Sequence, residues 1–316
     1  MKILVTPTSF KKYQNTKARE LLEGFADEIV YNPYGRPLES GEISKLAADC
    51  DGYIAGLDYI DAAALKDISN LKIISRYGSG VDRVDIQMAK EKGITVTNTP
   101  GTNATAVCEL AFGFMLSLAR SIPRLNTAVI NGQWPRNNGM ELKGKTLAIL
   151  GLGAIGRQLA KRALAFEMNV VAYDPYMDLG YATSNNIKSL SFDEAIKSGD
   201  FISLHMPLNP STKHCINKEV IELMKNGAYI INTARGGLID ENAACVALHN
   251  NKLGGMALDA YEVEPVTDSP LTKLDNVIST PHTGAHTDEA ISAMGMMSVK
   301  NLIAVLSGKE CKNIVI

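Results

Sequence analysis

The chain has 316 residues, a length that suits two domains of ordinary size, and 46% of its residues are apolar, enough for substantial cores. Its formal net charge of −2 argues against a nucleic-acid-binding protein, which would carry a large basic excess. The five cysteines are scattered and never form a CxxC pair, so we expect no disulfide framework and no metal site, and we expect a reducing, cytoplasmic location.

The N-terminal segment Met1–Pro7 has one cation and too short an apolar run for a signal peptide. The apolar run Ala111–Ala119 is broken by Gly113 and Ser117 and falls short of the ~20 residues that span a bilayer. We therefore expect no association with membranes.

The first 98 residues predict a second, smaller α/β domain. Short apolar runs bounded by polar residues indicate strands, although the pattern is weaker than in the middle of the chain. The candidate strands are Lys2–Val5, Tyr53–Ala55, Lys72–Ser75 and Thr95–Thr97.

The stretch Asn103–Ala119 predicts an unusually apolar helix, with Val107, Phe114 and Leu118 among its large side chains. Two interpretations fit this composition equally well. The helix is either buried between the two domains or also packs against a partner subunit.

The middle of the chain alternates short apolar runs with helical periodicity, which predicts a doubly wound α/β domain with a parallel sheet covered on both faces. The final helix, at about 287–306, brings no strand of its own and is expected to return to the first domain. We therefore expect a discontinuous substrate domain, 1–98 plus 287–316, and a nucleotide-binding domain, 99–286. The strands of the nucleotide-binding domain are Thr146–Leu150, Val170–Tyr173, Phe201–Leu204, Tyr229–Ile231, Met256–Leu258 and Val277–Ser279.

A dinucleotide-binding motif follows the first of these strands. Gly151-Leu152-Gly153-Ala154-Ile155-Gly156 has the GxGxxG pattern, placed between a predicted strand and a predicted helix. Gly151 permits a tight turn, Gly153 lets the backbone approach a pyrophosphate, and Gly156 lets the helix lie close to the sheet. The helix N-terminus then offers unpaired N–H groups to the phosphates.

Asp174 follows the next strand, 174 − 151 = 23 residues after the first glycine. An acidic residue about 20 residues on binds the adenosine ribose of NAD and disfavours the extra phosphate of NADP. The alternative is that Asp174 only opens the turn Asp174-Pro175-Tyr176. A methyltransferase can show a similar loop, so the chemistry must come from other residues.

Three residues after later strands can support hydride transfer between a nicotinamide and a small 2-oxo or 2-hydroxy acid. An arginine binds a carboxylate in a bidentate way, which suits Arg235. A histidine exchanges a proton with the substrate oxygen near neutral pH, which suits His282. A carboxylate such as Glu264 orients the imidazole. Each residue also has an alternative, purely structural interpretation. His282 could be a structural histidine, Glu264 a solvated loop residue, and Arg235 a cap at the end of a strand.

The sequence resembles the D-2-hydroxyacid dehydrogenase family, the group that includes 3-phosphoglycerate dehydrogenase. The resemblance covers nearly the whole chain. It rests on the motifs Asn98–Asn103, Leu150–Gly156, His205–Leu208, Asn232–Asp240, Leu258–Pro265 and Thr280–Gly284.

The resemblance implies two Rossmann-like domains, the catalytic set Arg235, Glu264 and His282, and a homodimer built on the apolar helix. It implies a substrate pocket lined by Ser79, Gly80 and Val81. The contacts to NAD that it implies come from Thr102, Val107, Ile155, Asp174, His205, Met206, Pro207, Thr212, Thr233, Ala234, Asp259 and Gly284.

Substrate identity depends on less specific signals. Arg76 follows a strand and is expected to point at the cleft and hold a phosphate, which makes 3-phosphoglycerate the first choice. Asp58 would repel that phosphate, and Arg76 has the alternatives of pairing with a nearby carboxylate such as Asp82 or of only holding the pocket in shape. Hydroxypyruvate, glyoxylate and D-lactate remain alternatives. A second functional class also remains open: an NADH-sensing binding protein that resembles the corepressors of this family. A formate dehydrogenase is a further alternative, but such enzymes carry glutamine at the position of Glu264, which argues against it.

Overall fold

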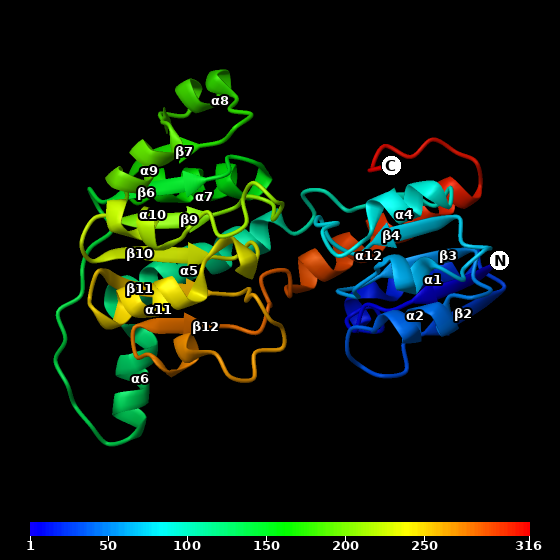
Figure 1. Cartoon of the computed structure of the whole chain (residues 1–316), viewed down its shortest axis with the longest axis horizontal. Coiled ribbons are helices and arrows are strands. Elements are labelled where there is room, and N and C mark those ends of the chain that lie inside the picture. The colour runs from blue at the N-terminus through cyan, green and yellow to red at the C-terminus, as the bar shows by residue number, and fades with distance from the viewer. The chain divides into compact units, whose positions relative to one another are not determined.

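The computed structural model describes all 316 residues and contains two compact units (Figure 1). Unit 1 comprises Met1–Asn103 and Ala285–Ile316, and unit 2 comprises Ala104–Gly284. The first boundary lies after Asn103 rather than after residue 98 because backbone hydrogen bonds join the intervening segment to unit 1. The amide of Asn98 donates to the Asn313 carbonyl at 3.2 Å, and that of Thr99 donates to the Gly78 carbonyl at 3.0 Å.

Unit 1 contains a five-stranded parallel sheet in the order β2-β1-β3-β4-β5. Helix α12 packs against β3 and β4, and α1 packs against α12. The strands are β1 (Lys2–Val5), β2 (Glu28–Tyr31), β3 (Gly52–Ala55), β4 (Ile73–Arg76) and β5 (Thr95–Thr97). The helices are η1 (Tyr13–Asn15), α1 (Thr16–Glu23), α2 (Ser40–Leu46), α3 (Ala62–Leu65), α4 (Ile86–Glu91) and α12 (Asp288–Leu306).

Unit 2 contains a seven-stranded parallel sheet in the order β12-β11-β10-β9-β6-β7-β8. Its strands are β6 (Thr146–Leu150), β7 (Asn169–Tyr173), β8 (Lys188–Ser189), β9 (Phe201–Leu204), β10 (Ala228–Asn232), β11 (Leu253–Leu258) and β12 (Val277–Ser279). Its helices are α5 (Ala104–Arg120), α6 (Ile122–Ile130), α7 (Ala154–Ala165), α8 (Leu179–Ser184), α9 (Phe192–Ser198), α10 (Lys218–Leu223), η2 (Gly236–Leu238), α11 (Glu241–His249) and η3 (Pro270–Lys273).

Alternate residues of the central strand β6 enter different cores. Leu147 and Ile149 pack in a core with residues of α5 and α7, whereas Ala148 and Leu150 pack in a core with residues of α9, α10 and α11. Successive side chains of a strand point to opposite faces, so a strand covered on both faces is apolar throughout. The predicted fold class, two doubly wound parallel domains, is confirmed.

Two strands were not expected from the sequence, β2 and β8, and both lie at the edges of their sheets. Their side chains are half-buried or exposed, and β8 has only two residues. Strand β8 contains no apolar residue for a pattern to detect, whereas Ile29–Tyr31 of β2 is a short apolar run that was not recognised as a strand.

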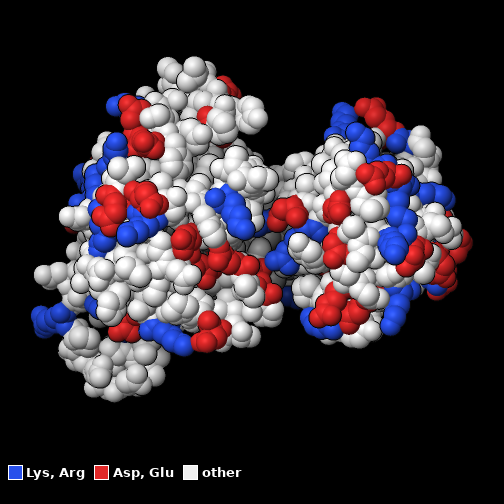
Figure 2. Space-filling model, viewed as in Figure 1, with Lys and Arg blue, Asp and Glu red and all other residues white.

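Helix α12 is long and apolar enough to cross a membrane by length and composition alone, and α5 with α6 passes the same test as a bent pair. Core helices of globular domains also pass it. Here α12 contacts strands of unit 1, and α5 contacts α7, β10 and β11. On the face drawn in Figure 2, acidic and basic side chains are interspersed over each unit.

Candidate active site

The glycine turn after β6 is held against the neighbouring strand. Gly151 has a φ of +101°, which favours glycine, and a Cβ there would lie 2.7 Å from the carbonyl oxygen of His205. A Cβ at Gly156 would lie 2.2 Å from the carbonyl oxygen of Gly151, so α7 approaches the turn as closely as the backbone permits. Space is open beyond Gly153, at the N-terminus of α7, where Ala154 and Ile155 begin the helix. This is the geometry in which a helix N-terminus receives phosphate.

Asp174 follows β7 and fixes this turn. Its Oδ2 accepts a hydrogen bond from the amide of Leu152 at 2.8 Å, and its Oδ1 accepts one from the amide of Tyr176 at 2.8 Å. The carboxylate therefore opens the turn, as the alternative interpretation holds, and also lies directly beside the glycine loop. The two interpretations do not exclude each other.

Two buried polar atoms at the ends of β9 and β10 have no hydrogen-bond partner in the protein, Nδ1 of His205 and Oγ1 of Thr233. The other ring nitrogen of His205 lies 2.8 Å from Oγ of Ser203. Burial lowers the pKa of His205 to about 4, so its imidazole is neutral at physiological pH. Unpaired buried polar atoms are costly unless a ligand pairs with them. The main chain of His205 lies against the glycine turn, and Thr233 follows a strand of the same sheet, so these unpaired atoms fit a bound dinucleotide.

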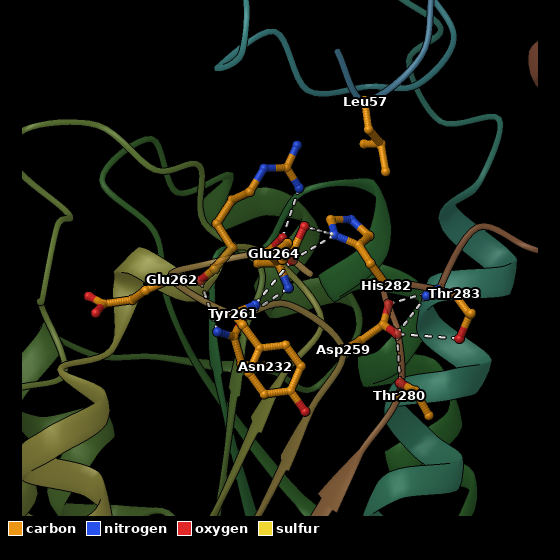
Figure 3. A network of polar contacts seen from close by, with 12 residues as sticks. Leu57, Asn232, Asp259, Tyr261, Glu262, Glu264, Thr280, His282 and Thr283 are labelled. Atoms are coloured by element: carbon orange, nitrogen blue, oxygen red, sulfur yellow. Dashed lines mark hydrogen bonds and ion pairs between the residues drawn. The ribbon is translucent and has the colours of Figure 1, made fainter. Parts of the chain in front are cut away.

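Asp259 holds the loop that carries His282. Its side chain is buried, and it accepts hydrogen bonds from the hydroxyl of Thr280 at 2.6 Å, the amide of Thr283 at 2.7 Å and the amide of Gly284 at 2.7 Å (Figure 3). His282 lies between these contacts with a φ of +52°. A non-glycine residue adopts this conformation rarely and only when its surroundings impose it. Asp259 thus fixes the backbone at His282.

His282 and Glu264 form a close pair. Nδ1 of His282 lies 2.9 Å from both carboxylate oxygens of Glu264, and one of these oxygens also accepts the amide of Tyr261 at 3.1 Å (Figure 3). Glu264 side-chain exposure is 17% and that of His282 is 25%. Glu264 is therefore no solvated loop residue. With Nδ1 donating to Glu264, Nε2 of His282 is the nitrogen left to exchange a proton with a substrate.

Arg235 follows β10 and is half-buried. Its Nη1 donates to the carbonyl of Ala234 at 2.8 Å, and the Asn232 side chain accepts from the Ala234 amide at 3.0 Å and donates to the Arg235 carbonyl at 2.9 Å. Asn232 thus shapes the turn that presents the guanidinium.

In the segment after β9, Met206 is buried and the Thr212 hydroxyl donates to the carbonyl of Pro207 at 2.7 Å.

In unit 1, Arg76, which was expected to point at a cleft, is buried at the end of β4. Arg76 is 3% exposed, and its guanidinium donates to the carbonyls of Ala55 at 2.8 Å and Gly80 at 3.2 Å. It joins the loops after β3 and β4, as the alternative of holding the pocket in shape describes. Asp58, expected to repel a phosphate, is buried too, and accepts hydrogen bonds from the amides of Leu38 at 2.7 Å and Gly56 at 3.0 Å.

The other expected substrate residues follow β4. Ser79, Gly80 and Val81 are partly exposed, and the Ser79 hydroxyl lies 3.2 Å from both the Thr99 carbonyl and the side-chain oxygen of Asn103. Thr102 also belongs to unit 1, with its hydroxyl donating to the Thr99 carbonyl at 2.8 Å. The residues predicted to be catalytic and the remaining residues predicted to bind the cofactor belong to unit 2. Within it, a Cβ on Gly284 would lie 3.4 Å from the side chain of Val107.

Sequence reasoning missed the residues that support the site, chiefly Ser203, Thr280 and Thr283. Ser203 is a buried hydroxyl inside an otherwise apolar strand, which is a signal that sequence carries. The threonines lie in the Thr280–Gly284 motif on either side of His282. No group of three or more His, Cys, Asp or Glu side chains is arranged to hold a metal ion.

This geometry agrees with a known family. The model of the NAD binding domain of D-isomer specific 2-hydroxyacid dehydrogenases matches residues 112–284, which lie within unit 2. The chain belongs to the D-isomer specific 2-hydroxyacid dehydrogenase family. Members of this family are NAD-dependent oxidoreductases, and the matched domain is the one that binds NAD. Bound NAD accepts or donates the hydride in their reaction.

Similar proteins carry different substrate names. The chain is 46% identical over 254 residues to a D-3-phosphoglycerate dehydrogenase of Methanocaldococcus jannaschii, covering 79% of this chain and 48% of that protein. It is 44% identical over 275 residues to a hydroxypyruvate reductase of Thermotoga maritima, covering 85% of this chain and 89% of that protein. The chain thus spans about half the length of the phosphoglycerate dehydrogenases that it matches. The crystal structure of an Aquifex aeolicus D-lactate dehydrogenase with NAD and lactic acid is 29% identical with a TM-score of 0.86, covering 99% of this chain and 98% of that one.

Proposed function

We propose that this protein is an NAD-dependent dehydrogenase that interconverts a small 2-hydroxy acid and the corresponding 2-oxo acid. The observation that carries the proposal is the pairing of His282 with both carboxylate oxygens of Glu264, at 2.9 Å, in the unit that holds the glycine turn. Imidazole and carboxylate in this arrangement serve as a proton carrier and its orienting partner.

Each residue of the set has a distinct task in this proposal. His282 donates a proton from Nε2 to the carbonyl oxygen during reduction, and accepts the hydroxyl proton during oxidation. Glu264 accepts from Nδ1, which keeps the ring oriented. Arg235 binds the substrate carboxylate through its guanidinium. Ser79, Gly80 and Val81 contribute to the substrate pocket, and Asp174 selects NAD over NADP.

Among substrates, we propose a singly charged 2-oxo acid such as glyoxylate, hydroxypyruvate or pyruvate in preference to a phosphorylated one. The reason for expecting a phosphate was Arg76, and its guanidinium is buried against main-chain carbonyls. Relatives named for phosphoglycerate, hydroxypyruvate and glyoxylate match at 46%, 44% and 38% identity, so identity does not separate these substrates.

The test is the rate of NADH oxidation with glyoxylate, hydroxypyruvate, pyruvate and 3-phosphohydroxypyruvate. Turnover with at least one acid supports the dehydrogenase, whereas tight NADH binding without turnover would identify a sensor. A kcat/KM for 3-phosphohydroxypyruvate well above that for hydroxypyruvate, and reduced by Arg76→Met, would restore the phosphorylated substrate.

We further propose a cytoplasmic homodimer, but with a different contact surface from the one expected. Helix α5 is largely buried within its own chain, so its apolar composition needs no partner. The exposed apolar side chains follow it, on α6 and just beyond: Val129 at 52%, Ile130 at 74% and Trp134 at 80% exposure. Light scattering should give twice the chain mass for the wild type and a smaller mass for Ile130→Asp. A wild-type monomer at micromolar concentration would refute the dimer.

A further inference from the structure

His214 and Glu262 form a second histidine–carboxylate pair, and the mechanism proposed above does not use it. Nε2 of His214 contacts Oε1 of Glu262, and the two side chains are 38% and 35% exposed. Glu262 comes two residues before Glu264 in the loop that follows β11. Nothing in the sequence links His214 to this loop, because the two partners lie 48 residues apart.

The backbone of His214 is joined to a different catalytic segment. Its amide donates to the carbonyl of Gly237 at 2.8 Å, in the turn η2 that follows Arg235. Two residues later, the amide of Ile216 donates to the carbonyl of Leu238 at 3.0 Å. His214 itself has a φ of +50°, a conformation that its surroundings must impose. One residue therefore contacts the Arg235 turn through its main chain and the Glu264 loop through its side chain.

The two segments that His214 joins are also packed directly against each other. A Cβ on Gly236 would lie 1.8 Å from the carbonyl carbon of Tyr261 and 2.2 Å from the amide nitrogen of Glu262. The same Glu262 amide donates to Oε1 of Glu241 at 2.9 Å, at the start of α11. A shift of the Glu262 main chain would thus move both the Arg235 turn and the carboxylate that orients His282.

From these contacts we infer that His214 is a positioning residue, which fixes the spacing between Arg235 and the Glu264–His282 pair by holding Glu262. The inference rests on the proposed function, because that spacing matters only if the three residues act on one substrate. His214 does not touch the reacting atoms. Its contribution is to the alignment of groups that do, and small misalignments of reacting groups reduce turnover.

The variant that tests this is His214→Ala, with His214→Gln as the conservative partner, since glutamine places an N–H donor near the position of Nε2. The matched control is Lys225→Gln. Lys225 forms a comparably exposed ion pair with Asp200, at 2.9 Å. Both residues precede strands of the same sheet, so this pair lies at the amino ends of the strands, away from the carboxyl ends that carry the candidate site.

Two measurements are made on each variant: steady-state kinetics with the preferred 2-oxo acid, and hydrogen exchange of the backbone amides in residues 259–264. We expect His214→Ala to lower kcat about fivefold, the scale of a partly exposed ion pair, with the Kd for NADH unchanged. Exchange in 259–264 becomes faster. His214→Gln recovers most of both effects, and Lys225→Gln shows neither.

Unchanged exchange in residues 259–264, or an equal change in Lys225→Gln, overturns the inference whatever the activity. Faster exchange with an unchanged kcat also overturns it, because His214 would then be merely structural. If the wild type turns over none of the acids, the proposed function fails, and the exchange data still decide whether His214 holds the loop.

Discussion

The two units both place charged residues at the carboxyl ends of their parallel strands, but they use those residues differently. In unit 1, Arg76 and Asp58 are 3% and 1% exposed, and both bind main-chain groups of neighbouring loops. In unit 2, the Glu264–His282 pair keeps partial exposure, and His205 and Thr233 keep buried polar atoms without protein partners. A charge that follows a strand is therefore not functional by position alone. Buried polar atoms without a protein partner do not separate the units either, because Tyr53 and Thr99 of unit 1 also carry such atoms. What unit 2 adds is a partly exposed histidine–carboxylate pair in the unit that also holds the glycine turn.

The sharpest test of this contrast is His282→Ala. We expect kcat to fall by about two to four orders of magnitude, the usual contribution of general acid–base catalysis, while the Kd for NADH stays the same. His249→Ala, on the exposed surface of α11, is the control for replacing a histidine in the same unit. Near-normal turnover in His282→Ala would remove this residue from the mechanism.

The reverse pattern is expected for Asp58→Ala in unit 1. Removing the carboxylate leaves the buried amide of Leu38 without its acceptor and takes one of two acceptors from the Gly56 amide and the Thr6 hydroxyl, at a cost of about 3 kcal/mol in the free energy of unfolding. Thermal unfolding measures the loss, and NADH binding by unit 2 should persist. Asp268→Ala removes an exposed carboxylate and should leave the Tm unchanged. An unchanged Tm in Asp58→Ala would contradict the structural role assigned to this residue.

A smaller effect, on the preference for NAD over NADP, is expected at Asp174, which both holds the glycine turn and is proposed to select the cofactor. Asp174→Asn keeps an acceptor for one of the amides of Leu152 and Tyr176 but removes the negative charge that disfavours a ribose phosphate. The ratio of kcat/KM for NAD over NADP should fall by about tenfold, equivalent to about 1.4 kcal/mol. Equal kcat/KM values for both cofactors in the wild type would show that Asp174 does not face the ribose.

A dependence of stability on pH is expected at His205. Its pKa is lowered to about 4 in the folded protein, whereas the unfolded chain protonates near the ordinary value of about 6.5. The unfolded state therefore binds more protons below pH 6.5, and stability falls as the pH drops from about 6.5 toward 4. The Tm of His205→Gln should fall less than that of the wild type between pH 7 and pH 4.5. Identical slopes would mean that this imidazole is not the buried neutral group described above.

Much of this fold follows from the sequence because burial on both faces makes a strand continuously apolar. Strands such as Phe201–Leu204 and Thr146–Leu150 were predicted at their observed bounds. Strand β8 was not, because Lys188-Ser189 contains no apolar residue, and the short apolar run Ile29–Tyr31 of β2 was not recognised. The glycine turn was likewise predictable, since backbone approach there permits no side chain at Gly151 or Gly156.

The sequence could not predict which of the two arginines is buried against main-chain carbonyls and which stays partly exposed. Arg76 and Arg235 each lie at or just after the end of a strand, and each suits a bound anion. Arg76 is buried because two main-chain carbonyls converge on its guanidinium. One is that of Ala55, at the end of β3 and 21 residues earlier in the chain, and the other is that of Gly80, four residues later. The partnership of His214 with Glu262 depends in the same way on how distant loops come together. Such contacts are properties of the assembled sheet edge, and no local pattern encodes them.

The left-handed backbone at His282 has a consequence for redesign. Asp259 imposes that conformation through the atoms of Thr280, Thr283 and Gly284, not through the imidazole. Shape and reactivity at this position are thus specified by different residues, so the reactive group can be exchanged without rebuilding the loop. Asparagine, which tolerates the same backbone angles, would leave a folded dinucleotide-binding protein that has lost its proton carrier. Under the proposed mechanism, this one substitution would convert a dehydrogenase into a protein that only binds the cofactor.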